Sequence, residues 1–126
     1  MKTIKLKIHL YASSEDIYNA LTNSFAVSLW TGLPATMDDK EGTEFSLWEG
    51  DIVGRNIEMI PNEKIVQEWY FGDQEEQSIV TIKLHKSEEG TQLEVIHTNI
   101  PDDDYADMLY GWKNYYLGSL KEFFDK

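Results

Sequence analysis

The sequence predicts an α+β fold in which a curved antiparallel sheet of six to seven strands wraps on a long C-terminal helix, with two short helices after the first strand. Three observations support this prediction. Several segments alternate apolar and polar residues, as half-buried strands do. Short turns join the segments in the middle of the chain, and one long amphipathic segment follows them. The 126 residues are expected to form a single domain over 1–126.

The first predicted strand runs from Thr3 to Leu10, where every second residue is apolar. Ser13 follows it and has Asp16 three residues later, a spacing typical of a capping box at the start of a helix. Asn23 can start a second short helix, and Gly32 ends that helix.

The middle of the chain is predicted to contain only strands and turns. Five strands are expected, at Thr43–Trp48, Ile52–Ile60, Ile65–Phe71, Ser78–His85 and Thr91–Asn99. Consecutive strands joined by short turns pair as an antiparallel meander. Such a sheet can bury one face and leave the other in water, and the long helix is the obvious cover for the buried face.

The C-terminal helix is predicted from about Asp103 to Phe124, a length of about 33 Å. Its large apolar residues recur at i, i+3, i+4 and i+7 and form a wide stripe. Pro101 and the aspartates Asp102 to Asp104 precede it. One aspartate is expected to cap the helix and the others to lie in its first turn, where the helix dipole favours negative charge. A calcium or magnesium site is the alternative, although no second acidic cluster lies nearby at ligand spacing.

Composition and charge exclude several classes of function. The chain has 11 Lys and Arg against 23 Asp and Glu, a net charge of −12, so neither nucleic acid nor an anionic membrane is an expected partner. Because there is no cysteine, thiol nucleophiles, disulfides, thiolate zinc sites and iron–sulfur clusters are excluded. No apolar run could span a membrane and the N-terminal residues lack the apolar core of a signal peptide, so we expect a cytoplasmic protein.

Strand alternation separates the three histidines. His9 and His85 fall on the polar sides of their strands, whereas His97 falls with Leu93 and Val95 and should face the interior. One interpretation is a core histidine that is hydrogen-bonded to a neighbour. The other is a polar anchor in an apolar pocket. A metal centre would need further inward ligands, which the sequence does not locate.

Motifs for catalysis are missing from the sequence. It contains no Gly-x-Ser-x-Gly elbow, no glycine-rich phosphate loop and no Gly-x-Gly-x-x-Gly fingerprint, so no cofactor is expected. A carboxylate pair is the remaining catalytic possibility, because four glutamates lie in predicted strands: Glu44, Glu58, Glu68 and Glu94.

Arg55 is the only arginine and lies in the middle of a predicted strand. The alternation of Val53, Ile57 and Met59 places it on the apolar side, where it would need a carboxylate partner such as Glu68. A change of register by one residue would turn it to water, so a surface arginine is an equal alternative.

Large aromatic residues are the strongest signal in the chain. The set comprises Trp30, Phe45, Trp48, Trp69, Phe71, Trp112, Tyr115 and Tyr116. Core packing is the plain interpretation of each ring. Large rings beneath one long helix can also leave a concave space, in which Tyr hydroxyls and Trp N–H groups need hydrogen-bond partners.

The order of elements resembles the helix-grip fold of the START-like (SRPBCC) superfamily. The local sequence is similar to the C-terminal domain of the activators of heat shock protein 90 ATPase. The similar stretches are Ala20–Thr22 followed by Trp30, Gly42–Leu47, Gly54, Pro61–Trp69, and Gly111–Trp112 with Tyr115–Tyr116. Each stretch alone is a weak signal, but their order and spacing together are specific and cover nearly the whole chain.

The resemblance implies an apolar cavity between the sheet and the C-terminal helix, which relatives use for lipids and other apolar small molecules. Two-domain activators of the family bind the chaperone and stimulate its ATPase through both domains. We expect this chain to lack the N-terminal activator domain and therefore to stimulate weakly at most. Phe45, Trp69 and Trp112 carry over as fold-building positions, and no catalytic residue carries over.

These observations lead to three hypotheses. The first is a non-enzymatic domain that binds an apolar small molecule in the cavity. The residues expected to line it are Trp30, Phe45, Trp69, Phe71, His97, Met108, Trp112, Tyr115 and Tyr116. The second is a co-chaperone module that binds a heat shock protein 90 type chaperone through its acidic surface and modulates the ATPase. The third is an enzyme of cyclase or hydrolase type, which would need inward polar groups besides His97.

Overall fold

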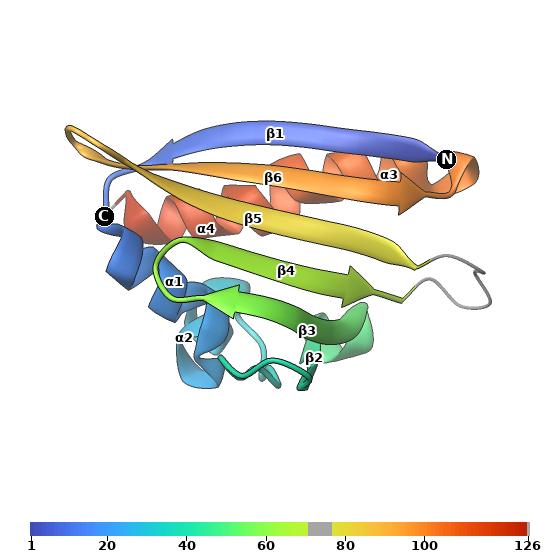
Figure 1. Ribbon diagram of the computed structural model, residues 1–126, viewed down its shortest axis with the longest axis horizontal. Coiled ribbons are helices and arrows are strands. Elements are labelled where there is room, and N and C mark those ends of the chain that lie inside the picture. Colours follow the sequence, from blue (N-terminus) through green and yellow to red (C-terminus); the bar gives the residue numbers. More distant parts are fainter. Residues whose placement is uncertain (71–76, 126) are drawn as a thin grey trace.

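The structure, a computed structural model, describes residues 1–70 and 77–125. One six-stranded antiparallel sheet has the order β1-β6-β5-β4-β3-β2 (Figure 1). Its strands are β1 (Lys2–Leu10), β2 (Glu44–Leu47), β3 (Ile52–Ile60), β4 (Lys64–Trp69), β5 (Ser78–Ser87) and β6 (Gly90–Ile100). The predicted α+β fold, with a curved antiparallel sheet and a long C-terminal helix, is confirmed. The predicted end of β4 at Phe71 lies outside the described residues.

Two short helices follow β1, as the capping residues predict. These are α1 (Ser14–Thr22) and α2 (Ser24–Thr31). The backbone N–H of Asp16 donates to the Ser13 hydroxyl at 3.0 Å and caps α1. The N–H of Ala26 donates to the Asn23 side chain at 2.9 Å and caps α2, which ends at Gly32 with a φ of +83°.

The C-terminal helix is continuous but changes its winding along its length. A 3-10 turn, η2 (Asp102–Asp104), leads into α3 (Tyr105–Gly111), then a π-helical segment, η3 (Trp112–Tyr116), and finally α4 (Leu117–Phe124). Figure 1 shows the helix running along one face of the sheet, with α1 and α2 near its C-terminal end. None of the described helices is long and apolar enough to cross a membrane.

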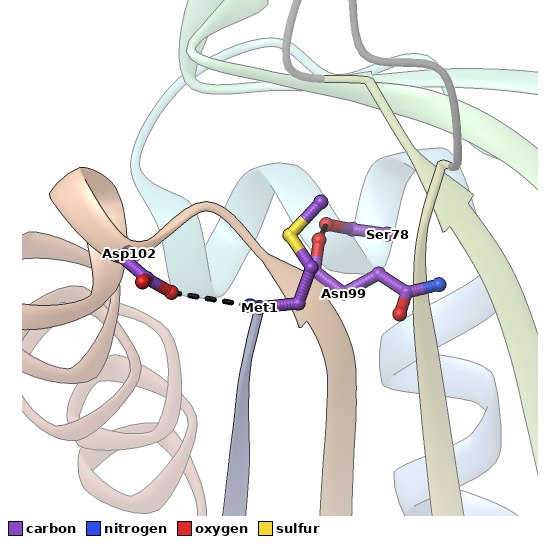
Figure 2. Close-up of polar contacts among 4 residues, drawn as sticks. All are labelled: Met1, Ser78, Asn99 and Asp102. Atoms are coloured by element: carbon purple, nitrogen blue, oxygen red, sulfur yellow. Dashed lines mark hydrogen bonds and ion pairs between the residues drawn. The ribbon is translucent and has the colours of Figure 1, made fainter.

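The backbone departs from regular strand geometry near the end of β6. Asn99 has a φ of +58°, and its carbonyl accepts a hydrogen bond of 2.7 Å from the Ser78 hydroxyl (Figure 2). The N-terminal amine of Met1 lies 3.2 Å from an oxygen of Asp102 and forms an ion pair with it. The prediction that an aspartate side chain caps the helix is wrong for the described residues, because neither turn at its start has a side-chain cap.

A bulge in β3 decides the direction of Arg55. The register between β3 and β4 shifts between Asn56 and Glu58, so the alternation read through Ile57 and Met59 does not extend back to Arg55. Arg55 is therefore exposed and lies opposite Glu68 on the outer face. The surface interpretation is the correct one.

The interior lies between the helices and the concave face of the sheet. His97 is fully buried there, as strand alternation predicts, whereas His85 is exposed and His9 is half-buried. Phe45 is also buried and packs over Gly54. A Cβ atom at Gly54 would lie 1.9 Å from the Glu68 carbonyl oxygen and 2.9 Å from the Phe45 ring. Only glycine therefore fits at this position, where β3 lies between β2 and β4.

Candidate functional site

A pocket of about 450 Å³ opens between the C-terminal helix and the region where η1 (Trp48–Gly50) leads into β3. The residues that line it are Trp48, Asp51, Ile52, Trp69, Met108, Gly111, Trp112, Tyr115 and Tyr116. The rings of Trp69, Trp112 and Tyr116 are almost fully buried, whereas Asp51 and Tyr115 are exposed. The pocket therefore has a floor of buried rings and a mouth at the surface.

Five of the nine residues predicted to bind a ligand lie around this pocket: Trp69, Met108, Trp112, Tyr115 and Tyr116. Trp30, Phe45 and His97 are buried but lie outside its lining. Phe71 lies outside the described residues. That these residues bind a ligand stays a prediction.

The floor is built from stacked rings. Trp69, at the end of β4, and Trp112, in η3, lie nearly parallel, with centroids 5.0 Å apart and an interplanar angle of 15°. The Tyr116 ring lies 4.5 Å from Trp112 at an angle of 46°. Such contacts add to the stability that burial of the rings provides.

Hydrogen bonds fix the polar edges of both tryptophans toward the protein. The Trp112 indole N–H donates to Nδ1 of His97 at 3.0 Å. The Trp69 indole N–H donates to the Gln67 amide oxygen at 2.9 Å, and the Gln67 amide donates to Asn56 at 3.0 Å. Since each indole has only one donor, both are satisfied within the protein, and the ring faces are left to border the pocket.

The bond from Trp112 also defines the state of His97. An indole N–H can only donate, so Nδ1 of His97 accepts and the ring is neutral with its proton on Nε2. Burial lowers the pKa of His97 to about 4, because the interior disfavours the charged imidazolium. At neutral pH His97 is thus a positioning group that holds the Trp112 ring, behind the pocket floor.

The amide of Asn56 connects this floor to the loop before β2. It donates to the carbonyl of Asp38 at 3.0 Å and to the hydroxyl of Thr43 at 3.2 Å. Both Asn56 and Gln67 are buried, so their polar atoms need these partners. The resulting chain of hydrogen bonds runs from Trp69 to the loop and fixes the orientation of the ring.

A second layer of rings supports the mouth. Trp30 of α2 lies 5.8 Å from Trp48 and 5.0 Å from Tyr116, in edge-to-face contacts. Its indole N–H donates to the carbonyl of Ala20 at 2.8 Å, which ties it to α1. Trp30 therefore positions two lining rings without bordering the pocket itself.

The helix contributes one face to the pocket. Met108, Gly111, Trp112 and Tyr115 are spaced three, four and seven residues apart, the spacing of one helical face. A Cβ atom at Gly111 would have no atom within 4 Å, so this position borders open space. The π-helical winding begins at the next residue, and such segments frequently occur at functional sites.

Four lining residues were not among those predicted to bind a ligand: Trp48, Asp51, Ile52 and Gly111. Asp51 and Ile52 follow η1, where Trp48 and Glu49 have φ values of +51° and +56°. No propensity signals two such non-glycine residues in succession. Gly111 could have been predicted as a lining residue, because a glycine inside a stripe of large apolar residues leaves space on that face of the helix.

The described lining residues include few ionisable groups. In the part of the chain that the structure describes, no group of three His, Asp or Glu residues could hold a metal ion. Asp51 is the one ionisable carboxylate among the described lining residues. Burial raises the pKa of the Tyr116 phenol, so this ring is neutral at physiological pH.

Comparison with known proteins places this architecture in a family. The Activator of 90 kDa heat shock protein ATPase homolog of Dictyostelium discoideum is 34% identical over 128 residues, which cover 98% of this chain and 33% of that protein. The human Activator of 90 kDa heat shock protein ATPase homolog 1 is 28% identical over 123 residues, or 96% of this chain and 36% of that protein. This chain thus spans about a third of the length of these curated relatives.

Solved structures show the same fold. The crystal structure of an HSP90 activator from Plasmodium falciparum superposes with a TM-score of 0.89 and 25% sequence identity, over 98% of this chain and 96% of that one. The family model for the Activator of Hsp90 ATPase homolog 1-like protein matches residues 11–125. Because this match spans most of the sequence and agrees with the fold, the chain belongs to the Activator of Hsp90 ATPase homolog 1-like protein family.

Proposed function

We propose that this protein is a binding protein, not an enzyme, and that its pocket takes an apolar or flat aromatic small molecule. The observation that carries the proposal is the floor of buried rings, Trp69, Trp112 and Tyr116, beneath a pocket of about 450 Å³. Ligand pockets commonly have volumes of about 300–1,000 Å³ and mostly apolar or aromatic walls.

The fixed orientation of the rings supports this proposal. Trp69 and Trp112 are held by hydrogen bonds to Gln67 and His97, so their faces do not need to rearrange when a ligand enters. A preformed site binds more tightly because little conformational entropy is lost on binding. A flat apolar molecule that enters the pocket would lose its contact with water, and the indole N–H groups of the floor would keep their partners.

A panel of flat aromatics, sterols and fatty acids tests the proposal. Trp48, Trp69 and Trp112 line the pocket, so a bound compound should change the intrinsic fluorescence. It should also raise the melting temperature, since binding to the native state adds about 2.7 kcal/mol at a hundredfold excess over the dissociation constant. Native mass spectrometry of the purified protein would show any ligand that is already bound. If no compound changes either signal, the proposal fails.

Gly111→Leu provides a matched blocking variant. The new side chain enters open space on the pocket face, so the protein should fold while binding is lost. Ala106→Leu introduces the same side chain at an exposed position of α3 and should bind like the unmodified protein. If Gly111→Leu binds normally, the ligand occupies another site.

We propose association with a heat shock protein 90 type chaperone as a second function. The observation that favours it is the similarity to named activators of the heat shock protein 90 ATPase. The net charge of −12 gives the chain a surface suited to a basic patch on such a partner.

Ionic strength separates the two functions. Association through exposed charges should weaken as salt rises, since their interactions are screened beyond about 8 Å at physiological salt. Binding of a neutral apolar ligand should change little. The measurement is binding to a purified chaperone, and its ATPase rate, at 50 and 300 mM salt. Absence of binding at the lower salt would rule out the second function and leave the first intact.

A further inference from the structure

We propose that the ligand of this pocket is a small organic cation whose apolar or aromatic body carries a quaternary or protonated amine. This inference rests on the proposed binding function and adds the charge of the ligand. It starts from the charges of the lining. Among the described lining residues, Asp51 is the one that carries a full charge, no lysine, arginine or histidine is present, and Tyr116 is neutral.

The rings supply the main attraction. Three indoles and two phenols line the pocket, and the face of an aromatic ring carries negative electrostatic potential. A cation within about 6 Å of such faces is attracted, most strongly by tryptophan and where water is excluded. Trp48 is half-buried and Tyr115 is 60% exposed, so a ligand can reach these two rings, and the buried rings of Trp69, Trp112 and Tyr116 form the floor behind them.

Asp51 places a carboxylate at the mouth. Its backbone N–H donates to the carbonyl of Trp48 at 3.2 Å, and both residues line the pocket. A cation seated on the rings lies near this negative charge, whereas a fatty-acid carboxylate would meet repulsion from both the charge and the ring faces. The charge of −12 on the whole chain favours the approach of cations in the same sense.

The shape of the mouth allows a ligand larger than an ammonium group. Tyr115 is 60% exposed and contacts the equally exposed Tyr110 in an edge-to-face pair, with centroids 5.8 Å apart. A volume of about 450 Å³ exceeds what one methylated ammonium fills, so the site fits a whole small molecule with the cation attached to its body.

Three probes with the same naphthalene body test the inference. They are (2-naphthylmethyl)trimethylammonium, its uncharged carbon analogue 2-neopentylnaphthalene, and 2-naphthylacetate. Dissociation constants are measured by isothermal titration calorimetry, with chemical shifts of the tryptophan N–H groups as the second readout. We expect the cation to bind about tenfold more tightly than the uncharged analogue, and the carboxylate to bind least tightly.

The outcomes separate this inference from the proposed function. If the uncharged analogue binds as tightly as the cation, or more tightly, the preference for a cation is wrong and apolar binding stands. If none of the three probes binds but an uncharged member of the wider panel does, the preference for a cation is likewise wrong. If nothing in either set binds, the proposed function fails as well.

Asp51→Asn measures the contribution of the carboxylate. It should weaken binding of the cation about three- to tenfold and leave the uncharged analogue unchanged, because only the charged probe interacts with the lost charge. Glu88→Gln is the matched control. It removes one negative charge from the exposed turn between β5 and β6, at the opposite end of the strands from Trp69, and should change neither constant. If the two variants weaken binding of the cation equally, only the net charge of the chain contributes to its affinity, and Asp51 does not contact the ligand.

Discussion

The C-terminal helix covers the sheet in two different ways. Its last part, α4, buries Leu117 and Leu120 and contacts α2 and β1, with aliphatic side chains that close the core. Its middle part buries Trp112 and Tyr116 equally well, yet the pocket opens beside them. One helix on one sheet therefore leaves the larger pocket, of about 450 Å³, at one end, whereas a smaller hollow of about 240 Å³ opens beside Leu117 at the other.

The difference shows that the kind of side chain decides where space remains. Leucine and isoleucine adapt to their neighbours and interdigitate at high density. The tryptophans are flat and rigid, and hydrogen bonds to Gln67 and His97 fix their edges. Rings held in this way cannot turn to fill the space beside Gly111. The following predictions test this contrast.

Trp112→Ala should have the largest effect. The ring is fully buried and donates to His97, so its removal leaves a cavity and an unpaired acceptor. The free energy of unfolding should fall by about 3–5 kcal/mol, measured by urea denaturation. Lys113→Glu, at an exposed neighbouring position, should change it by less than about 0.5 kcal/mol. Unchanged stability of Trp112→Ala together with loss of a protein partner would instead mark the ring as a docking surface.

Leu120→Ala should destabilise the α4 end without affecting the pocket. Leu120 has no exposed surface, so the free energy of unfolding should fall by about 3 kcal/mol. Because Leu120 lies outside the lining, the rise in melting temperature that a ligand causes should be the same as in the unmodified protein. Loss of ligand binding in a variant that is still folded would show that the two ends are one cooperative unit.

The stability that the pocket end provides should also depend on pH, because His97 lies there. The pKa of His97 is lowered from 6.5 to about 4, so the unfolded chain binds more protons than the native state between these values. The contribution of His97 to the free energy of unfolding is fully present above pH 6.5 and should fall by about 3 kcal/mol as the pH drops to 4. The measurement compares the unfolding free energy of the unmodified protein and of His97→Gln across this range. In an NMR titration, three similar histidine curves near 6.5 would contradict the assignment.

Two glycines of the helix provide the smallest and most local comparison. Gly111→Ala should stabilise the protein by about 1 kcal/mol, because alanine favours a helix and its Cβ meets open space. At Gly118 the new Cβ would lie 3.1 Å from the Lys113 carbonyl oxygen, so Gly118→Ala should gain less or destabilise. Thermal unfolding of both variants tests the pair, and equal gains would mean that the π segment relaxes to accept the new atom.

The buried face of the sheet could be predicted from the sequence because alternation carries the information. His97 shares its parity with Leu93 and Val95, and all three are buried. The first residues of α1 and α2 could also be predicted from the capping residues Ser13 and Asn23, because a cap depends on one side chain and the backbone near it.

The pocket itself could be predicted only in part. Strand alternation shows which way a side chain points but not how deep it lies, so His97 was expected in the lining and lies behind it. Trp48 and Asp51 reach the mouth through a turn with two left-handed residues, which no local preference predicts. The direction of Arg55 depended on a bulge that only the pairing of β3 with β4 reveals.

The π-helical segment sets the rotation about the helix axis between the side chains that precede it and those that follow it. In a regular α-helix each residue advances by about 100°, so Leu117 and Leu120 would point about 80° to 180° away from Met108 and Trp112. The wider winding over Trp112–Tyr116 takes up about one residue of this rotation and turns both sets toward the sheet. The helix therefore consists of two α-helical parts, α3 and α4, and the π-helical segment between them rotates one relative to the other about the helix axis. The number of residues in this segment determines how the pocket faces the core, independently of the side chains that either part carries.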